Sequence, residues 1–282
     1  MNPHRYLPAV TASAVLGFGV AATAAGAEPE AAIASAAVTT ARPDWEGAIG
    51  LNLGYRPEYS GAAQHAVKAA PGFFLRWGRF TITNSSGFVT RRSDDVVRGL
   101  GLDLIRDDRL RLNLALRYDA GRSETTSADL AGTGDIKPTV RARASASYRL
   151  DGPWRLGASW SVDAFGRGGG SSGDVSVGWD HALGAQTTLG AGLSLGFAAD
   201  RYMQTYYGIN EAQALRTGYP VYTPKAGLRD LSVYANARHD LGEDWIVLGG
   251  ASVTRLLGPA ADSPLTTRRS NWGLNVGLAR RF

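Results

Sequence analysis

Apolar and polar residues alternate along most of this chain, and a period of two predicts β-strands. The alternation is clearest at residues 110–119, where leucines and Tyr118 share one parity and arginine, asparagine and aspartate the other. It begins at Trp45 and continues to Phe282, interrupted by turn-like and loop-like sequences. We predict twelve strands, at 45–55, 73–77, 80–91, 100–104, 110–119, 140–149, 154–163, 175–179, 189–197, 231–237, 245–256 and 271–282.

The last predicted strand, Asn271 to Phe282, indicates where the apolar face points. Its apolar parity has an aromatic residue at each end, Trp272 and Phe282, and its other parity is small or polar. A soluble β-sandwich strand could show this alternation. An apolar face bounded by aromatics and ending in Phe282 favours a transmembrane barrel, in which Phe282 closes the barrel by pairing with the first strand. Arg280 lies on the apolar parity, where it can snorkel to the membrane boundary.

The predicted connections fall into two classes that alternate along the chain. Short turns are predicted at 106–108, 151–153, 183–185 and 240–243, whereas the loops at 56–67, 121–137, 166–173, 199–227 and 258–268 are mostly longer. Short periplasmic turns and long outer loops are typical of outer-membrane barrels, which in bacteria have an even number of strands. A soluble β-sandwich has no reason to sort its loops in this way. We therefore predict an all-β fold, a transmembrane antiparallel up-and-down β-barrel of about twelve strands.

The first 27 residues have the features of a cleaved secretory signal peptide. Arg5 supplies the positive charge, residues 14–22 are apolar, and residues 25–27 form an A-x-A site that predicts cleavage after Ala27. Residues 28–44 show no strand pattern and are predicted to be a flexible periplasmic leader, followed by the barrel at 45–282. Past Ala27 no apolar stretch is long enough to span a bilayer as a helix.

Composition and net charge exclude some classes of partner and site. The formal charge of +5 becomes +4 without the signal peptide, because Arg5 is its only charged residue. That excess suits anionic lipid headgroups or an anionic polymer but is too small to indicate nucleic acid. The chain has no cysteine, which excludes disulfides and thiolate metal sites.

Motifs for catalysis are also missing from the sequence. The four histidines lack the spacing of a helical zinc site, and no G-x-S-x-G is present. A Ser-His-acid cluster remains the catalytic arrangement to look for, since some barrels are lipases or proteases. We expect no catalytic, cofactor or metal site and do not expect an enzyme.

The parity opposite the apolar face is rich in arginine. One interpretation is a lumen that passes or holds small anions. The other, which we favour, is a set of internal ion pairs with Asp103, Asp119 and Asp163 that fills a narrow barrel. The candidate lumen residues are Arg111, Arg117, Arg141, Arg143, Arg149 and Arg155.

The longest predicted loop combines aromatic and basic residues. This mixture suits contact with a protein or a glycan, but it equally suits a loop that folds over the barrel mouth and packs its own aromatics. One helical turn is predicted at 211–215 within this loop. The candidate contact residues are Tyr202, Tyr206, Tyr207, Tyr219 and Tyr222.

Several segments of the chain resemble the MipA/OmpV family of outer-membrane proteins, also called MltA-interacting proteins. The most specific are YMQTYYGI, from Tyr202, and LLGPAADSP, from Leu256. Further similarity extends through residues 202–228, 255–264 and the closing strand, and is visible at 50–61 and 121–122.

The resemblance implies a protein of the cell outer membrane, embedded among its lipids. It also implies a scaffold that links a lytic transglycosylase to a bifunctional murein synthase in peptidoglycan assembly. Other members imply two alternatives: a narrow porin-like channel for small solutes, or a surface adhesin that uses its long outer loops. The family brings no catalytic or binding motif at the level of single residues.

Overall fold

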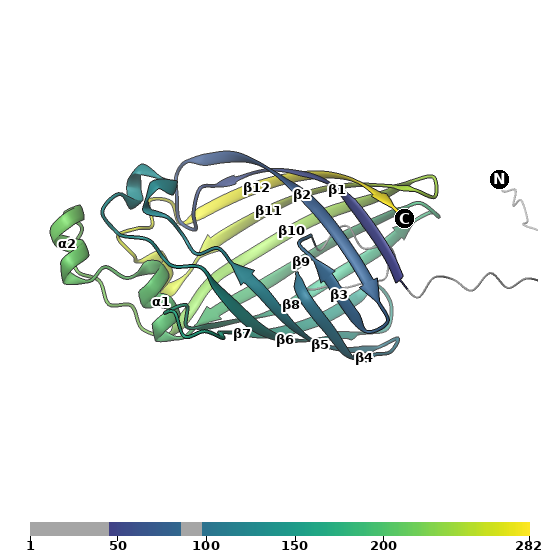
Figure 1. Ribbon diagram of the computed structural model, residues 1–282, viewed down its shortest axis with the longest axis horizontal. Coiled ribbons are helices and arrows are strands. Elements are labelled where there is room, and N and C mark those ends of the chain that lie inside the picture. The colour runs from purple at the N-terminus through teal and green to yellow at the C-terminus, as the bar shows by residue number, and fades with distance from the viewer. Residues whose placement is uncertain (1–44, 86–97) are drawn as a thin grey trace, which may run out of the picture. The chain divides into compact units, whose positions relative to one another are not determined.

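The computed structural model describes residues 45–85 and 98–282, which form a closed antiparallel barrel (Figure 1). Each strand pairs with the next in the chain, and the last pairs with the first, which confirms the predicted up-and-down barrel. The signal peptide and leader predicted for residues 1–44 lie outside the described residues. The strands are β1 (Trp45–Pro57), β2 (His65–Trp77), β3 (Phe80–Thr83), β4 (Gly99–Arg106), β5 (Leu110–Asp119), β6 (Thr139–Arg149), β7 (Trp154–Asp163), β8 (Ser171–Leu183), β9 (Thr187–Ala198), β10 (Gly227–Leu241), β11 (Trp245–Leu256) and β12 (Ser270–Arg281).

The connections differ sharply between the two ends of the barrel. At one end, which we call the short-turn end, residues 78–79, 107–109, 150–153, 184–186 and 242–244 join the strands. At the other, the loop end, the loops contain α1 (Asp200–Tyr207), α2 (Glu211–Thr217) and α3 (Gly258–Ala261). Figure 1 shows the first two helices at the end opposite Phe282. The predicted sorting of short and long connections is confirmed.

Within residues 45–85 and 98–282, no helix is long and apolar enough to cross a membrane.

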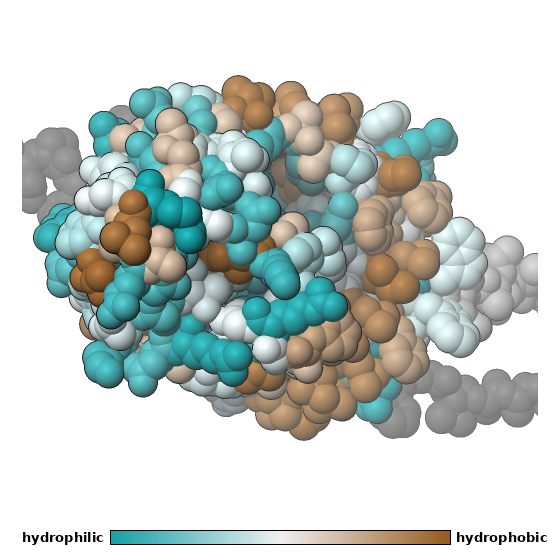
Figure 2. Space-filling model, turned by 60° about the vertical axis from the view of Figure 1, so that its left-hand side comes forward, coloured by the Kyte–Doolittle hydropathy of each residue, from teal (hydrophilic) through white to brown (hydrophobic). Residues whose placement is uncertain are grey.

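The outer face of the barrel is apolar and bounded by aromatics. Leucine, valine and isoleucine side chains of alternate strand positions are exposed around the wall, as Leu51, Leu114, Val233 and Val276 illustrate. Figure 2 shows hydrophobic residues over the strands and hydrophilic residues over the loop end. Two aromatic girdles flank this band, as expected at lipid–water interfaces. They comprise Trp45, Trp77, Tyr148, Trp154, Trp245 and Phe282 near the short-turn end, and Tyr55, Tyr118, Trp160 and Trp272 near the loop end.

The inner face carries a buried layer near the short-turn end, contributed by β1, β2, β10, β11 and β12. Phe74 and Ile246 are 1% and 0% exposed, and Phe74 packs with Ala48 and Ala279. Beside them lie buried charges that pair with one another: Arg76 donates to Glu46 Oε1 over 2.9 Å. Arg238 and Arg281 both contact the carboxylate of Asp240. We call this apolar and ionic layer the inner plug, defined by Glu46, Ala48, Phe74, Arg76, Arg238, Asp240, Ile246, Ala279 and Arg281.

Strand β2 is longer than the sequence predicted, because the loop expected at 56–67 ends before His65. The alternation is hidden there by alanines, Lys68 and Pro71. Pro71 is opposite Leu51 of β1, while β3 pairs only with residues 74–77 of β2. A proline has no backbone N–H to donate, so it fits in the part of β2 that β3 does not reach. The Asn84 side chain takes that place: it accepts from the Phe73 amide over 2.8 Å and donates to the Pro71 carbonyl over 2.9 Å.

Two further expectations about loops change. The segment 166–173 is not all loop, because β8 begins at Ser171 and pairs with β7. The helical turn predicted at 211–215 is confirmed as part of α2, and the break at 199–227 also contains α1, which was not predicted. The Asn210 side chain and Gln213 form a capping box at the start of α2, and Gly218 ends the helix in the left-handed conformation at φ 73°. Of the predicted third strand, 80–91, only residues 80–83 form β3; residues 86–91 lie outside the described part.

The seam between β1 and β12 closes the barrel. Phe282 exchanges two backbone hydrogen bonds with Gly47, of 3.0 and 3.2 Å, and its ring lies 5.6 Å from that of Trp45. Gly50 lies on the inner face of this seam opposite Ala279. A Cβ atom added to Gly50 would lie 2.1 Å from the Leu278 carbonyl oxygen, so only glycine lets the two strands approach this closely.

We predict that Gly50→Ala destabilises barrel closure. The added methyl would force β1 and β12 apart and lower the free energy of unfolding by about 1–3 kcal/mol. Gly54→Ala is the matched control, because it lies on the same strand and face but its Cβ would meet nothing closer than 3.8 Å. The measurement is the urea midpoint of heat-modifiable migration in gels. Equal midpoints for the two variants would contradict this account of the seam.

Candidate functional site: a loop cap over the barrel mouth

The loops at the loop end pack together through two apolar clusters. We call residues 58–64, 120–138, 164–170, 199–226 and 257–269 the loop cap. The first cluster joins Met203 and Tyr207 of α1 to Ala260 of α3 and to Leu256 of β11. The second joins four separate loops through Tyr59, Ala62, Leu130, Ile209 and Leu265, all buried. Loops with their own buried core are held in one arrangement rather than left free in solvent.

Hydrogen bonds between loops reinforce this packing. The Tyr59 hydroxyl donates to the Leu265 carbonyl over 2.9 Å, and the Ser263 hydroxyl donates to the Tyr207 carbonyl over 2.6 Å. Burial, together with nearby Asp129, raises the pKa of Tyr59 to about 12, so its hydroxyl stays protonated and able to donate. The Gln213 amide donates to the Thr133 carbonyl over 2.6 Å, which ties α2 to the β5–β6 loop.

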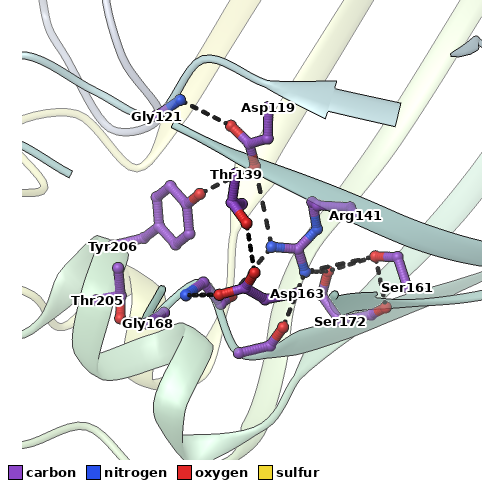
Figure 3. A network of polar contacts seen from close by, with 12 residues as sticks. Asp119, Gly121, Thr139, Arg141, Ser161, Asp163, Gly168, Ser172, Thr205 and Tyr206 are labelled. Carbon is purple, nitrogen blue, oxygen red and sulfur yellow. Dashed lines mark hydrogen bonds and ion pairs between the residues drawn. The ribbon is translucent and has the colours of Figure 1, made fainter. Parts of the chain in front are cut away.

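Arg141 anchors the loop cap to the strands (Figure 3). Its guanidinium donates to the carbonyl oxygens of Gly169 and Gly170 over 3.0 and 3.2 Å, and lies 3.9 Å from Asp119 Oδ2. The same Asp119 oxygen accepts from the Tyr206 hydroxyl over 3.1 Å. Asp163, on the next strand, accepts from the Gly169 amide over 2.8 Å. Residues at the loop-end termini of β5, β6 and β7 thereby hold the loop at 164–170 and helix α1 in place.

The other predicted lumen arginines lie on the inner face but in different surroundings. Arg143 contacts Asp174 and Arg155 contacts Asp180, each at 3.3 Å. Register places Arg111 opposite Ser147, Arg117 opposite Arg141, and Arg149 opposite Arg155. Arg141, Arg143 and Arg155 thus contact carboxylates of nearby strands on the inner face, and all six arginines share the parity of the lumen.

The five predicted loop tyrosines pack within the loop cap. Tyr207 is buried, and the rings of Tyr202 and Tyr206 stack at 4.5 Å. The guanidinium groups of Arg141 and Arg229 lie over the Tyr202 ring, at 5.3 and 5.6 Å from its centre. The hydroxyls of Tyr219 and Tyr222 donate to the carbonyls of Asp129 and Pro259. The most exposed apolar side chain of this loop is instead Leu215 on α2, at 89%.

A cavity of about 610 Å³ lies between the loop cap and the strands, and we call it the mouth cavity. A second cavity, of about 530 Å³, lies in the lumen and is lined by asparagines and glycines together with Arg56 and Lys68. Lys68 lines both. The mouth cavity is lined by Glu58, Tyr59, Ser60, Lys68, Ala120, Gly121, Arg122, Ser123, Thr126, Tyr202, Tyr206, Tyr207, Arg229 and Asp230.

Arg122 is the residue of this site that sequence reasoning did not single out. One guanidinium nitrogen donates to the Tyr206 carbonyl over 2.9 Å, and its Cζ atom lies 5.9 Å from the centre of the Tyr59 ring. Its Nε is buried and has no hydrogen-bond partner among the described residues. Burial lowers the pKa of Arg122. Residues 121–122 resemble the family, but the sequence does not indicate that the Arg122 side chain lies beside Tyr59 and Tyr206, which only the folded loop reveals.

Within the described part of the chain, the histidines make separate contacts. His181 stacks on Trp179 at 5.4 Å, and His239 Nδ1 lies 2.9 Å from the Thr187 hydroxyl, both near the short-turn end. Among residues 45–85 and 98–282, no group of three or more His, Asp or Glu side chains is placed to hold a metal ion.

The closed barrel, its apolar band and its aromatic girdles define an integral protein of the outer membrane. The chain belongs to the family of the MltA-interacting protein MipA, whose model matches residues 49–282. No curated protein matches the sequence.

Several solved outer-membrane barrels are similar in fold. An outer membrane channel from Pseudomonas putida F1 has 13% identity and a TM-score of 0.42, covering 84% of this chain and 95% of the channel. OmpT of Vibrio cholerae has 8% identity and a TM-score of 0.38, covering 84% and 97%. A Pseudomonas aeruginosa FadL homologue has 10% identity and a TM-score of 0.38, covering 84% and 90%. No conclusion about function rests on these likenesses.

We predict that Arg141→Met loosens the loop cap while leaving the barrel closed. Loss of the charged hydrogen bonds to Gly169 and Gly170 would cost about 2 kcal/mol, so the amides of α1 would exchange about thirtyfold faster. Arg149→Met is the matched control, since Arg149 is exposed at the far end of the same strand. Hydrogen exchange followed by mass spectrometry is the measurement. Unchanged exchange in α1 would show that Arg141 does not anchor the loop cap.

Proposed function

We propose that this protein is a non-enzymatic scaffold that holds a lytic transglycosylase, together with a bifunctional murein synthase, at the inner surface of the outer membrane. The family to which the chain belongs is named for interaction with MltA. Interaction, rather than transport or catalysis, is the role that this name supports.

The structural observation that carries the proposal is the inner plug. Side chains of five neighbouring strands pack together on the inner face near the short-turn end, and Phe74 and Ile246 are almost wholly buried there. A packed interior has low compressibility and resists deformation. The plug therefore supports a rigid platform on which a soluble enzyme can dock, rather than an open passage.

The docking surface would lie on the turns of the short-turn end and on the leader predicted at 28–44. The turns carry exposed charges of both signs. Arg109 and Asp151, from neighbouring turns, form a 2.9 Å ion pair with side chains 62% and 90% exposed. Exposed ion pairs contribute little to stability, so such residues are free to serve recognition.

Site-specific photo-cross-linking tests which end binds the enzymes. A photoreactive residue at Asp108, in a short turn, is expected to capture a lytic transglycosylase in intact envelopes, with the murein synthase recovered in the same complex. The matched position is Glu211, exposed on α2 at the loop end. Mass spectrometry identifies the products. Capture from Glu211 but not from Asp108, or from neither, would contradict the proposed scaffold.

A narrow channel for small solutes is the second candidate, because the lumen contains a cavity of about 530 Å³ lined by polar groups. The inner plug is then the barrier. We predict that Phe74→Ala raises the ionic conductance of the protein in planar bilayers above that of the wild type. Phe73→Ala is the control, because Phe73 precedes it on the same strand but faces outward and is 40% exposed. Equal conductance of Phe74→Ala and the wild type would show that the plug is not the barrier.

A further inference from the structure

We propose that the mouth cavity binds a compact hydroxylated anion, such as an acidic or phosphorylated monosaccharide, whose anionic group is held by Arg122 and Lys68. The site lies at the loop end. It is therefore independent of the scaffold role, which concerns the short-turn end.

The cavity has the size and construction of a ligand site. Its volume of about 610 Å³ falls in the usual range of small-molecule pockets. Its walls come from the β1–β2 loop, the β5–β6 loop, helix α1, and strands β2 and β10. The apolar clusters and hydrogen bonds of the loop cap hold these walls in place, so the cavity exists before any ligand arrives.

Arg122 gives the cavity an unbalanced positive charge. Burying an ion is costly unless a counter-charge and hydrogen bonds compensate it. The interactions that the Arg122 side chain makes with described residues are with a carbonyl and with tyrosines, and its buried Nε has no acceptor among them. An anionic group entering the cavity beside Arg122 would supply the missing counter-charge.

The other charges of the cavity are consistent with one anionic group. Arg229 and Asp230 contact each other, and Arg229 also lies over the Tyr202 ring, so this pair is internally balanced. Lys68 and Arg122 then face a single remaining carboxylate, Glu58. The described lining therefore carries one excess positive charge. A cationic ligand would be repelled, and a purely apolar one would leave these groups desolvated.

The remaining polar groups favour a ligand that carries hydroxyls. Glu58 provides a strong acceptor, and the hydroxyls of Ser60 and Ser123 line the same space. Tyr202, Tyr206 and Tyr207 add surface that is both apolar and polar. A ligand with a carboxylate or phosphate at one end and hydroxyls at the other would match the polar groups of this lining. Such a ligand could arrive as a free solute or as the sugar of an outer-leaflet glycolipid.

Calorimetric titration of the purified full-length protein tests the proposal. D-Glucuronate and D-glucose 6-phosphate are expected to bind, and neutral D-glucose to bind at least about tenfold more weakly, since a charged hydrogen bond is worth about 1.5–3 kcal/mol. Arg122→Gln is expected to weaken binding of both anions at least about tenfold, and Lys68→Gln by several-fold. Arg201→Gln, which changes an exposed guanidinium on α1 outside the cavity lining, should bind as the wild type does.

Heat-modifiable migration verifies that each variant is folded. If Arg122→Gln fails to fold, Lys68→Gln decides, because no partner for the Lys68 side chain occurs among the described residues. Displacement of glucuronate by purified lipopolysaccharide would identify a glycolipid sugar as the ligand, and lack of displacement a free solute. The proposal is overturned if neither anion binds the wild type, if glucose binds equally well, or if the folded Arg122 and Lys68 variants both bind as the wild type does.

Discussion

The whole structure depends on satisfying backbone hydrogen bonds in a solvent that offers none. Inside a bilayer an unpaired amide or carbonyl costs several kcal/mol, so a sheet can cross only if it closes on itself. The seam between β1 and β12 completes the ladder, and Gly50 lies opposite Ala279 on its inner face because a larger side chain at Gly50 would hold the strands apart. Pro71 and Asn84 meet the same constraint. Pro71, which has no backbone N–H, lies in the part of β2 that the short strand β3 does not reach, and the Asn84 side chain provides the hydrogen bonds that a neighbouring backbone would otherwise make.

Closure of the wall leaves the two ends free to differ. At the short-turn end the connections are too short to fold on their own, and the inner face there carries the inner plug. At the loop end the segments are long enough to bury tyrosines, leucines and a methionine against one another. The barrel thus has one end suited to presenting a rigid surface and another that encloses a cavity.

Arginine has different roles at the loop end, and the groups around each guanidinium decide which role it has. Arg141 is buried with carbonyls and a carboxylate around it, so its charge is compensated and it holds loops in place. The Arg122 guanidinium lies beside tyrosines and one carbonyl, so its charge has no counter-charge of this kind among the described residues, and an anionic ligand would provide one. The same side chain is structural in one position and suited to a ligand in the other, because a buried charge is stable only when it is paired.

The sequence alone determined the strands, their number, the barrel and the sorting of loops, because a period of two and the apolar outer face follow directly from the alternation of residues such as Leu110 to Asp119. It failed at the start of β2, where alanines, lysine and proline hide the alternation, and it missed α1, a helix of only eight residues within a long loop. Only the tertiary structure decided which loops meet, which tyrosines are buried, and that Arg122 and Lys68 line one cavity. Those facts depend on contacts between residues far apart in the chain, and local periodicity carries no information about them.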